Sequence, residues 1–169
     1  MTGRLAFLPW LWLGGALLFV AVVAPSAFAV LPTRALAGLL VGRVLPVLFW
    51  SGAVVGAILV GTHGGWRRLA ALVLCGTCLS AQLLLTPRIQ RLRAELGPDI
   101  EAVPASDARR VAFGRLHGVS VALLGLGMLG AAAIALAELA RGGAVDGTVL
   151  GATAGAGTRR AATRAEPSR

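Results

Sequence analysis

The sequence LAFLPWLWLGGALLFVAVVAPSAFAVL, residues 5–31, decides the fold, because it is either a retained membrane helix or a signal that is cut away. Two features favour a signal: Arg4 precedes the run, and AFA at 27–29 has the small-x-small pattern that signal peptidase recognises. The apolar stretch before Pro25 is about twenty residues long, however, whereas a signal peptide has an apolar region of roughly 7–15 residues. That length suits a helix that crosses about 30 Å of hydrocarbon. We therefore expect a retained span, with Pro25 as a helix bend near the membrane face.

The composition of the whole chain places the remaining residues in the same environment. Hydrophobic residues make up 57% of the 169 positions, and the mean hydropathy is +0.81. A water-soluble domain could not hide so many apolar side chains and still present a polar surface. The net charge of +9 comes from basic residues that lie between apolar runs. We therefore expect the arginines to contact lipid headgroups and set topology, and we expect the lipid bilayer, not nucleic acid, as the partner.

Four apolar runs are long enough to cross a membrane as helices. In lipid, only a helix or a closed barrel satisfies its own backbone, and these runs exceed the roughly ten residues of a barrel strand. The sequence thus predicts an all-α, polytopic membrane protein with a four-transmembrane-helix bundle. The predicted spans are residues 5–31, 44–62, 69–85 and 111–140.

The links between these spans differ in character. Residues 32–43 predict a helix lying at the interface before the second span. Residues 86–96, TPRIQRLRAEL, carry apolar and basic residues on separate stripes, which predicts a short interfacial helix before the long third link. Proline and acidic residues in 97–110 indicate a solvated loop. After the membrane domain of residues 1–141, the Gly/Ala/Arg composition of 142–169 predicts a disordered tail.

An even number of spans places both termini on one side of the membrane. Arginines are more frequent near the first and third links than near the membrane on the terminal side, which favours cytoplasmic links and both termini outside. We expect an integral protein of the plasma membrane, or of the inner membrane if the source is bacterial. The arginines on the link side are Arg34, Arg43, Arg88, Arg91, Arg93, Arg109, Arg110 and Arg115.

Polar residues at the start of the fourth span are the strongest functional candidates. His117 and Ser120 are three apart and share a helix face, and Arg115 lies just before them. Together with Arg88, which follows the third span, they could form an anion-attracting entrance. The alternative is structural, since polar side chains in membranes often hold helices together by hydrogen bonds.

Small residues and cysteines within the spans have structural explanations as well. Gly52/Gly56 and Gly114/Gly118 have the four-residue spacing that lets a neighbouring helix come close. The CxxC pair Cys75 and Cys78 could act as a metal or redox site, although it falls inside an apolar helix without a second CxxC. Helix packing is the simpler interpretation of both cysteines.

Several short stretches of the sequence form an ordered set. They are WLGG at 12–15, Pro25 with Phe28, Ala37-Gly38, Leu45-Pro46, Pro87-Arg88, and Phe113 with LHGVS at 116–120. Together they resemble the domain-of-unknown-function family 4149, which includes transmembrane protein 205-like proteins. The resemblance implies a four-span membrane protein without a settled biochemical activity. The first span is also remotely similar to the copper-resistance D membrane proteins.

Three functions remain open at this point. The first is a bundle that moves or senses a small solute or ion, with Arg88, Arg115, His117 and Ser120 at its mouth. The second is a structural or accessory subunit that packs as a homo-oligomer or within a membrane complex. The third is a haem- or copper-binding membrane protein, and neither of the first two requires a cofactor. No nucleophile–base pair, phosphate loop or acidic metal cluster appears in the sequence, so we expect neither an ordinary hydrolase nor a kinase, and an enzyme remains open only in the third case.

Overall fold

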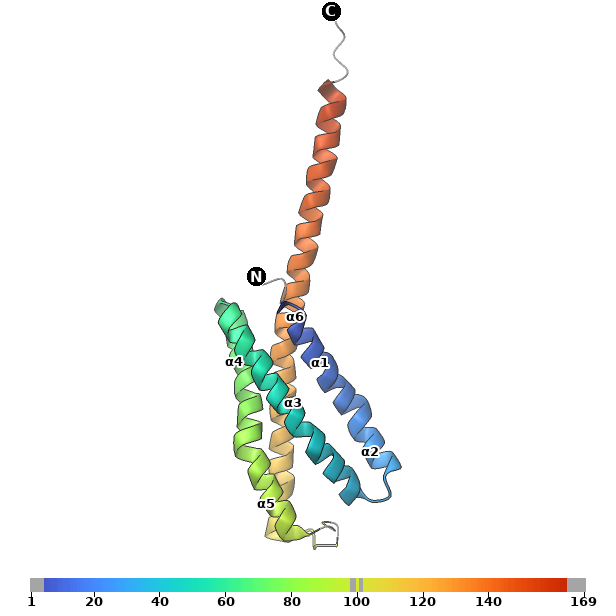
Figure 1. Ribbon diagram of the computed structural model, residues 1–169, viewed down its shortest axis with the longest axis vertical. Coiled ribbons are helices and arrows are strands. Elements are labelled where there is room, and N and C mark those ends of the chain that lie inside the picture. Colours follow the sequence, from blue (N-terminus) through green and yellow to red (C-terminus); the bar gives the residue numbers. More distant parts are fainter. Residues whose placement is uncertain (1–4, 98–99, 101, 164–169) are drawn as a thin grey trace, which may run out of the picture. The chain divides into compact units, whose positions relative to one another are not determined.

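The computed structural model describes residues 5–97, 100 and 102–163. This part of the chain is helical and contains no strand, which confirms the predicted all-α fold. The chain divides into two compact units, Met1–Ala135 and Leu136–Arg169, and the helical bundle belongs to the first (Figure 1). The elements in chain order are α1 (Leu8–Leu18), η2 (Phe19–Val23), α2 (Ala24–Val30), α3 (Arg34–Thr62), α4 (Gly65–Ser80), η3 (Ala81–Leu85), α5 (Thr86–Leu96) and α6 (Ala108–Thr163), where η2 and η3 are π-helical turns.

Four continuous helical stretches of the described chain are long and apolar enough to cross a membrane, as predicted. They run over Leu8–Val30, Arg34–Thr62, Gly65–Leu96 and Ala108–Arg141. Many of their large apolar side chains, such as Leu11, Val47 and Leu129, are exposed on the outside of the helices. Water would make such surfaces costly, whereas lipid solvates them. The protein is therefore an integral membrane protein.

The second span is longer than its apolar core, and this corrects one prediction. No separate interfacial helix forms over residues 32–43, because α3 begins at Arg34 and continues without interruption to Thr62. Thr33 caps its start by accepting a hydrogen bond of 3.2 Å from the backbone N–H of Leu36. Pro46 lies inside the helix without ending it. The link between the first two spans thus shrinks to residues 31–33.

The first and third spans each contain a π turn directly before an X-Pro pair. The turn η2 precedes Ala24-Pro25, and η3 precedes Thr86-Pro87. A proline ring inside a helix clashes with the carbonyl four residues earlier and removes one N–H donor, and a widened turn relieves that clash. The first span continues through Pro25 to Val30. Pro25 therefore does not end the span, and the local irregularity lies in the turn before it.

The helix predicted for residues 86–96 forms as α5, but it is a continuation of the third span and not a separate element after a link. At η3, the hydroxyl of Thr86 satisfies a backbone carbonyl, because it donates a hydrogen bond of 3.1 Å to the carbonyl of Ala81. Gly97 ends the helix with φ of +80°, a left-handed conformation that favours glycine. The third span and α5 therefore form one helical wall that reaches Leu96.

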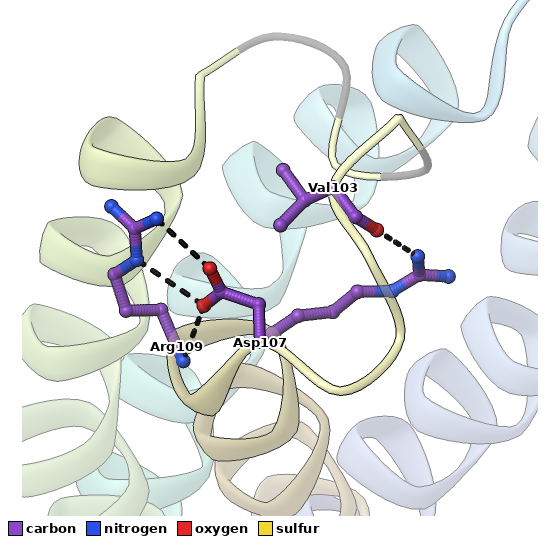
Figure 2. A network of polar contacts seen from close by, with 4 residues as sticks. Val103, Asp107 and Arg109 are labelled. Carbon is purple, nitrogen blue, oxygen red and sulfur yellow. Dashed lines mark hydrogen bonds and ion pairs between the residues drawn. The ribbon is translucent and has the colours of Figure 1, made fainter.

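The fourth span begins at a polar cap. Asp107 accepts a hydrogen bond of 2.8 Å from the backbone N–H of Arg109 and pairs with the Arg109 guanidinium at 3.0 Å (Figure 2). These contacts hold the pKa of the Asp107 carboxyl at about 2, below its ordinary value of 3.8. The carbonyl of Val103 accepts a hydrogen bond from the guanidinium of Arg110, as Figure 2 also shows. The loop before α6 is thereby tied to its first turn.

The core of the first unit contains buried residues of all four spans, among them Trp12, Phe49, Leu74 and Ile134. Trp12 is buried, and its indole N–H donates a hydrogen bond of 3.0 Å to the carbonyl of Leu48 in α3. A Cβ atom at Gly52 would come within 2.8 Å of the Trp12 ring and 2.6 Å of the Cys78 sulfur. The absence of a side chain at Gly52 therefore allows α1, α3 and α4 to pack around one point.

Two glycines of α6 allow this helix to pack closely against α4. A Cβ atom at Gly130 would lie 2.8 Å from the carbonyl O of Ala70, and one at Gly127 would lie 3.0 Å from the Thr77 hydroxyl. No comparable neighbour exists at Gly114 or Gly118, where a Cβ atom would meet nothing within 4 Å. The close packing predicted at this second pair is therefore not seen, and the contact lies three turns farther along the helix.

The second unit, Leu136–Arg169, is described as helix as far as Thr163. The helix thus continues past Arg141 into the segment for which the sequence predicts disorder. Six glycines between 142 and 157 each reduce helix stability in water by roughly 1 kcal/mol relative to alanine. Disorder of this tail in solution stays a prediction, and residues 164–169 lie outside the described part.

Candidate functional site

A cavity of about 880 Å³ lies between α2, α3, α5 and the first turns of α6. It is situated at the end of the bundle where the two links 31–33 and 97–107 are found. Three helices each contribute one stripe of residues at helical spacing. The stripe of α3 includes Arg34, Gly38, Val41 and Leu45; that of α5 is Thr86, Ile89, Gln90 and Arg93; that of α6 is Arg110, Phe113, Gly114, His117 and Ser120.

Arg93 is held in this cavity by a contact between helices. Its Nη1 donates a hydrogen bond of 2.7 Å to the carbonyl O of Gly38 in α3. A Cβ atom at Gly38 would collide with the Arg93 guanidinium, and one at Gly42 would lie 3.3 Å from Nη1. The pair Gly38/Gly42 therefore makes room for a cation, although its spacing is also typical of helix packing.

The predicted residues His117 and Ser120 both line the cavity. Ser120 is buried and His117 is exposed at the edge, where its ring stacks on Phe113 with centroids 6.4 Å apart. Their three-residue spacing places them on one face of α6, as the sequence predicts.

The predicted residues Arg88 and Arg115 do not line the cavity. Arg88 is exposed on α5, and it precedes Arg93 by five positions, which corresponds to about 140° around a helix. Arg115 lies in a separate shallow depression with Val111 and Leu116. It is about 160° from His117 around α6. The two arginines therefore lie outside the cavity, and a functional role for them stays a prediction.

Three other arginines line the cavity, and they are not among the functional candidates chosen from the sequence. Arg34, Arg93 and Arg110 line the cavity, and each lies in the terminal turn of its helix at the link end. A usable signal exists in retrospect, because Arg93 follows Thr86, Ile89 and Gln90 at spacings of 7, 4 and 3 on one stripe. Among the described residues that line the cavity, none is Asp or Glu. The charged residues in the described lining of the cavity are therefore all basic.

The guanidinium groups determine what this arrangement can bind. A guanidinium is planar and carries five N–H donors, and this geometry matches carboxylate and phosphate oxygens. The bond to Gly38 uses one donor of Arg93. The remaining donors are available for the oxygens of an anion at the cavity wall.

Cys75 and Cys78 lie outside this site. Cys78 is buried in the core beside Gly52, and the backbone of Cys75 lies against Gly56 at 2.7 Å from a Cβ atom built there. The predicted close packing at Gly52 and Gly56 is present, with both cysteines on its other side. Within the described residues, no group of three or more His, Cys, Asp or Glu side chains could hold a metal ion.

Comparison with known proteins identifies one family. The family model described as "Domain of unknown function (DUF4149)" matches residues 7–97, which include the cavity walls formed by α2, α3 and α5. Neither the curated proteins nor the solved structures contain a match. The remote likeness to copper-resistance D proteins stays a prediction.

Proposed function

The chain belongs to the DUF4149 family, and we propose that it binds a small anionic solute in the cavity at its link end and moves or senses that solute. One observation carries the proposal: Arg93 lines the cavity, and its bond to Gly38 uses one of the five N–H donors of the guanidinium. Arg34 and Arg110 line the same cavity. Guanidinium donors that face a cavity can bind the oxygens of an anion. A binding role for anions accounts for this arrangement.

The proposed roles of the individual residues follow from their positions. Arg93 is the central ligand, because its contact with Gly38 fixes the guanidinium in place. Arg34 and Arg110 add positive charge on the two facing helices. His117 is placed at the edge of the cavity, where it can contact a bound solute. With the orientation that the arginine distribution favours, the solute enters from the cytoplasm.

The test compares two arginines of the same helix. The purified protein is heated in detergent with inorganic phosphate, with acetate, or with sodium chloride at the same ionic strength, and unfolding is followed by tryptophan fluorescence. A ligand that binds the folded state raises Tm. We expect phosphate or acetate to raise Tm beyond the chloride control in the wild type and in Arg88→Gln, and to have no such effect in Arg93→Gln.

Two results would contradict the proposal. One is an anion effect that is the same in Arg93→Gln as in the wild type, and the other is an effect no larger than that of chloride. His117→Ala serves as a second probe, with protein abundance measured in parallel. A reduced anion effect at unchanged abundance supports a role in the site, whereas a fall in abundance shows that the residue is structural. Uptake of radiolabelled phosphate by proteoliposomes distinguishes transport from sensing.

A further inference from the structure

The volume of the cavity is too large for a simple inorganic anion. A cavity of about 880 Å³ falls within the range of roughly 300–1,000 Å³ that is typical of sites for drug-sized organic molecules. A single phosphate or carboxylate group bound at Arg93 would fill only a small part of it. The remaining space must be occupied by another part of the same ligand or by water.

Charged and apolar groups are separated along the depth of the cavity. The three arginines lie in the terminal turns of α3, α5 and α6, at the link end. Leu45 and Pro46 lie about 17 Å farther along α3 than Arg34, at a rise of 1.5 Å per residue. Ile89 lies one turn deeper than Arg93 on α5. The mouth is therefore cationic, and the wall that α3 contributes to the interior is apolar, whereas α5 and α6 contribute Thr86, His117 and Ser120 there.

Two hydroxyl groups in the interior do not change this polarity. Thr86 donates its hydroxyl hydrogen bond to the carbonyl of Ala81 in its own helix. A hydroxyl that bonds within its own helix does not require a polar group on a ligand. Ser120 is buried, so little of its surface faces the cavity. The deep walls thus favour hydrocarbon over water.

From this separation of charge and apolar surface, we infer that the ligand is an anionic amphiphile, with a compact phosphate or carboxylate headgroup between the arginines and an apolar chain that extends toward Leu45 and Pro46. The inference rests on the proposed anion binding and specifies its substrate class. Such a molecule could come from the surrounding lipid leaflet or from the aqueous phase, and both sources share the same recognition chemistry.

Gly114 provides a way to test where the chain lies. It lines the cavity, and a Cβ atom there would meet nothing within 4 Å, so a larger side chain can enter the empty space. Gly118 lies one turn farther along α6, has equally open surroundings and does not line the cavity. Gly114→Leu and Gly118→Leu are therefore a matched pair that differs in cavity volume alone.

The experiment measures the binding of radiolabelled octyl phosphate and ethyl phosphate to the full chain in phosphatidylcholine nanodiscs. Burial of each additional methylene strengthens binding roughly fourfold. Burial of only two of the six additional methylenes would therefore make octyl phosphate bind at least about tenfold more tightly than ethyl phosphate. We expect Gly114→Leu to lose this preference and Gly118→Leu to retain it. The octyl chain partitions into the bilayer equally in both samples. A difference in octyl preference between Gly114→Leu and Gly118→Leu therefore measures binding of the chain in the cavity. Arg93→Gln should weaken binding of both phosphates.

The outcomes separate this inference from the function on which it rests. If the two phosphates bind equally and Arg93→Gln abolishes the binding of both, the ligand is not an amphiphile, and the proposal of anion binding still stands. An octyl preference that survives in Gly114→Leu places the chain outside the cavity and also overturns the inference. No binding of either phosphate refutes both proposals. If binding follows the expected pattern, competition by phosphatidic acid in the nanodisc identifies a membrane source, and displacement by soluble alkyl phosphates alone identifies an aqueous one.

Discussion

The Nη1 atom of Arg93 donates a hydrogen bond of 2.7 Å to the carbonyl O of Gly38, across the interface between α5 and α3. This contact holds Arg93, among the arginines of α5, against the cavity. It joins residues that are 55 positions apart in the sequence, and it depends on the absence of a side chain at Gly38.

Gly38→Ala should therefore displace the Arg93 guanidinium, because the added Cβ atom would occupy its position. The guanidinium is the flexible end of a long side chain and can move away, so we expect the helix to remain folded. The effect of phosphate on Tm should fall toward that of Arg93→Gln. The matched control is Gly61→Ala in the same helix, where a Cβ atom meets nothing within 4 Å. A full phosphate effect in Gly38→Ala would show that Gly38 does not position the cation.

Gly56→Ala should destabilise the contact between α3 and α4. The added Cβ atom would lie 2.7 Å from the backbone nitrogen of Cys75, and a backbone atom cannot move aside as a side chain can. Overpacking of this kind costs about 1–3 kcal/mol, measured as the free energy of unfolding in a titration with sodium dodecyl sulfate. Gly76→Ala in α4 has open surroundings and should be neutral or stabilising by up to about 1 kcal/mol. Equal effects of the two substitutions would exclude close packing at Gly56.

The cap of α6 should respond to acid at an unusually low pH. Because the pKa of Asp107 is about 2 in the folded protein and 3.8 in its ordinary state, its contacts with Arg109 are complete above about pH 4. They are lost as the pH falls through about 2. Titration of the Asp107 carboxyl carbon by NMR checks the midpoint, and a midpoint near 4 would contradict the contact. Asp107→Asn keeps a good capping residue and should remove the pH dependence.

Much of the fold could be predicted from the sequence, because a membrane span needs only an apolar run of about twenty residues. The number and order of the spans follow from this rule. The ends of the helices do not, since α3 and α5 continue past their apolar cores into segments that contain Arg34 and Arg93. Hydropathy reports where lipid begins and ends, whereas a helix ends only where its backbone is capped, as at Thr33 and Gly97.

The candidate site was predicted only in part, for a different reason. His117 and Ser120 share a face of one helix, and periodicity within that helix is sufficient to pair them. The stripe of Thr86, Ile89, Gln90 and Arg93 can be read within residues 86–96, but a carbonyl and two glycines of another helix decide that this stripe faces the cavity. Local periodicity therefore identifies the residues of one face, and the partner helix decides which face is used.

The two π turns have a further consequence for how the length of the chain is constrained. A π turn is equivalent to one residue inserted into an α-helix, and one residue corresponds to a rotation of about 100°. The insertion at η3 therefore sets the angular phase of everything that follows it in the third span. Deleting one residue from Ala81–Leu85 would restore regular winding and turn the face that carries Arg93 away from α3. Deletion of a single residue would thus remove Arg93 from the cavity wall without substituting any residue that lines the cavity.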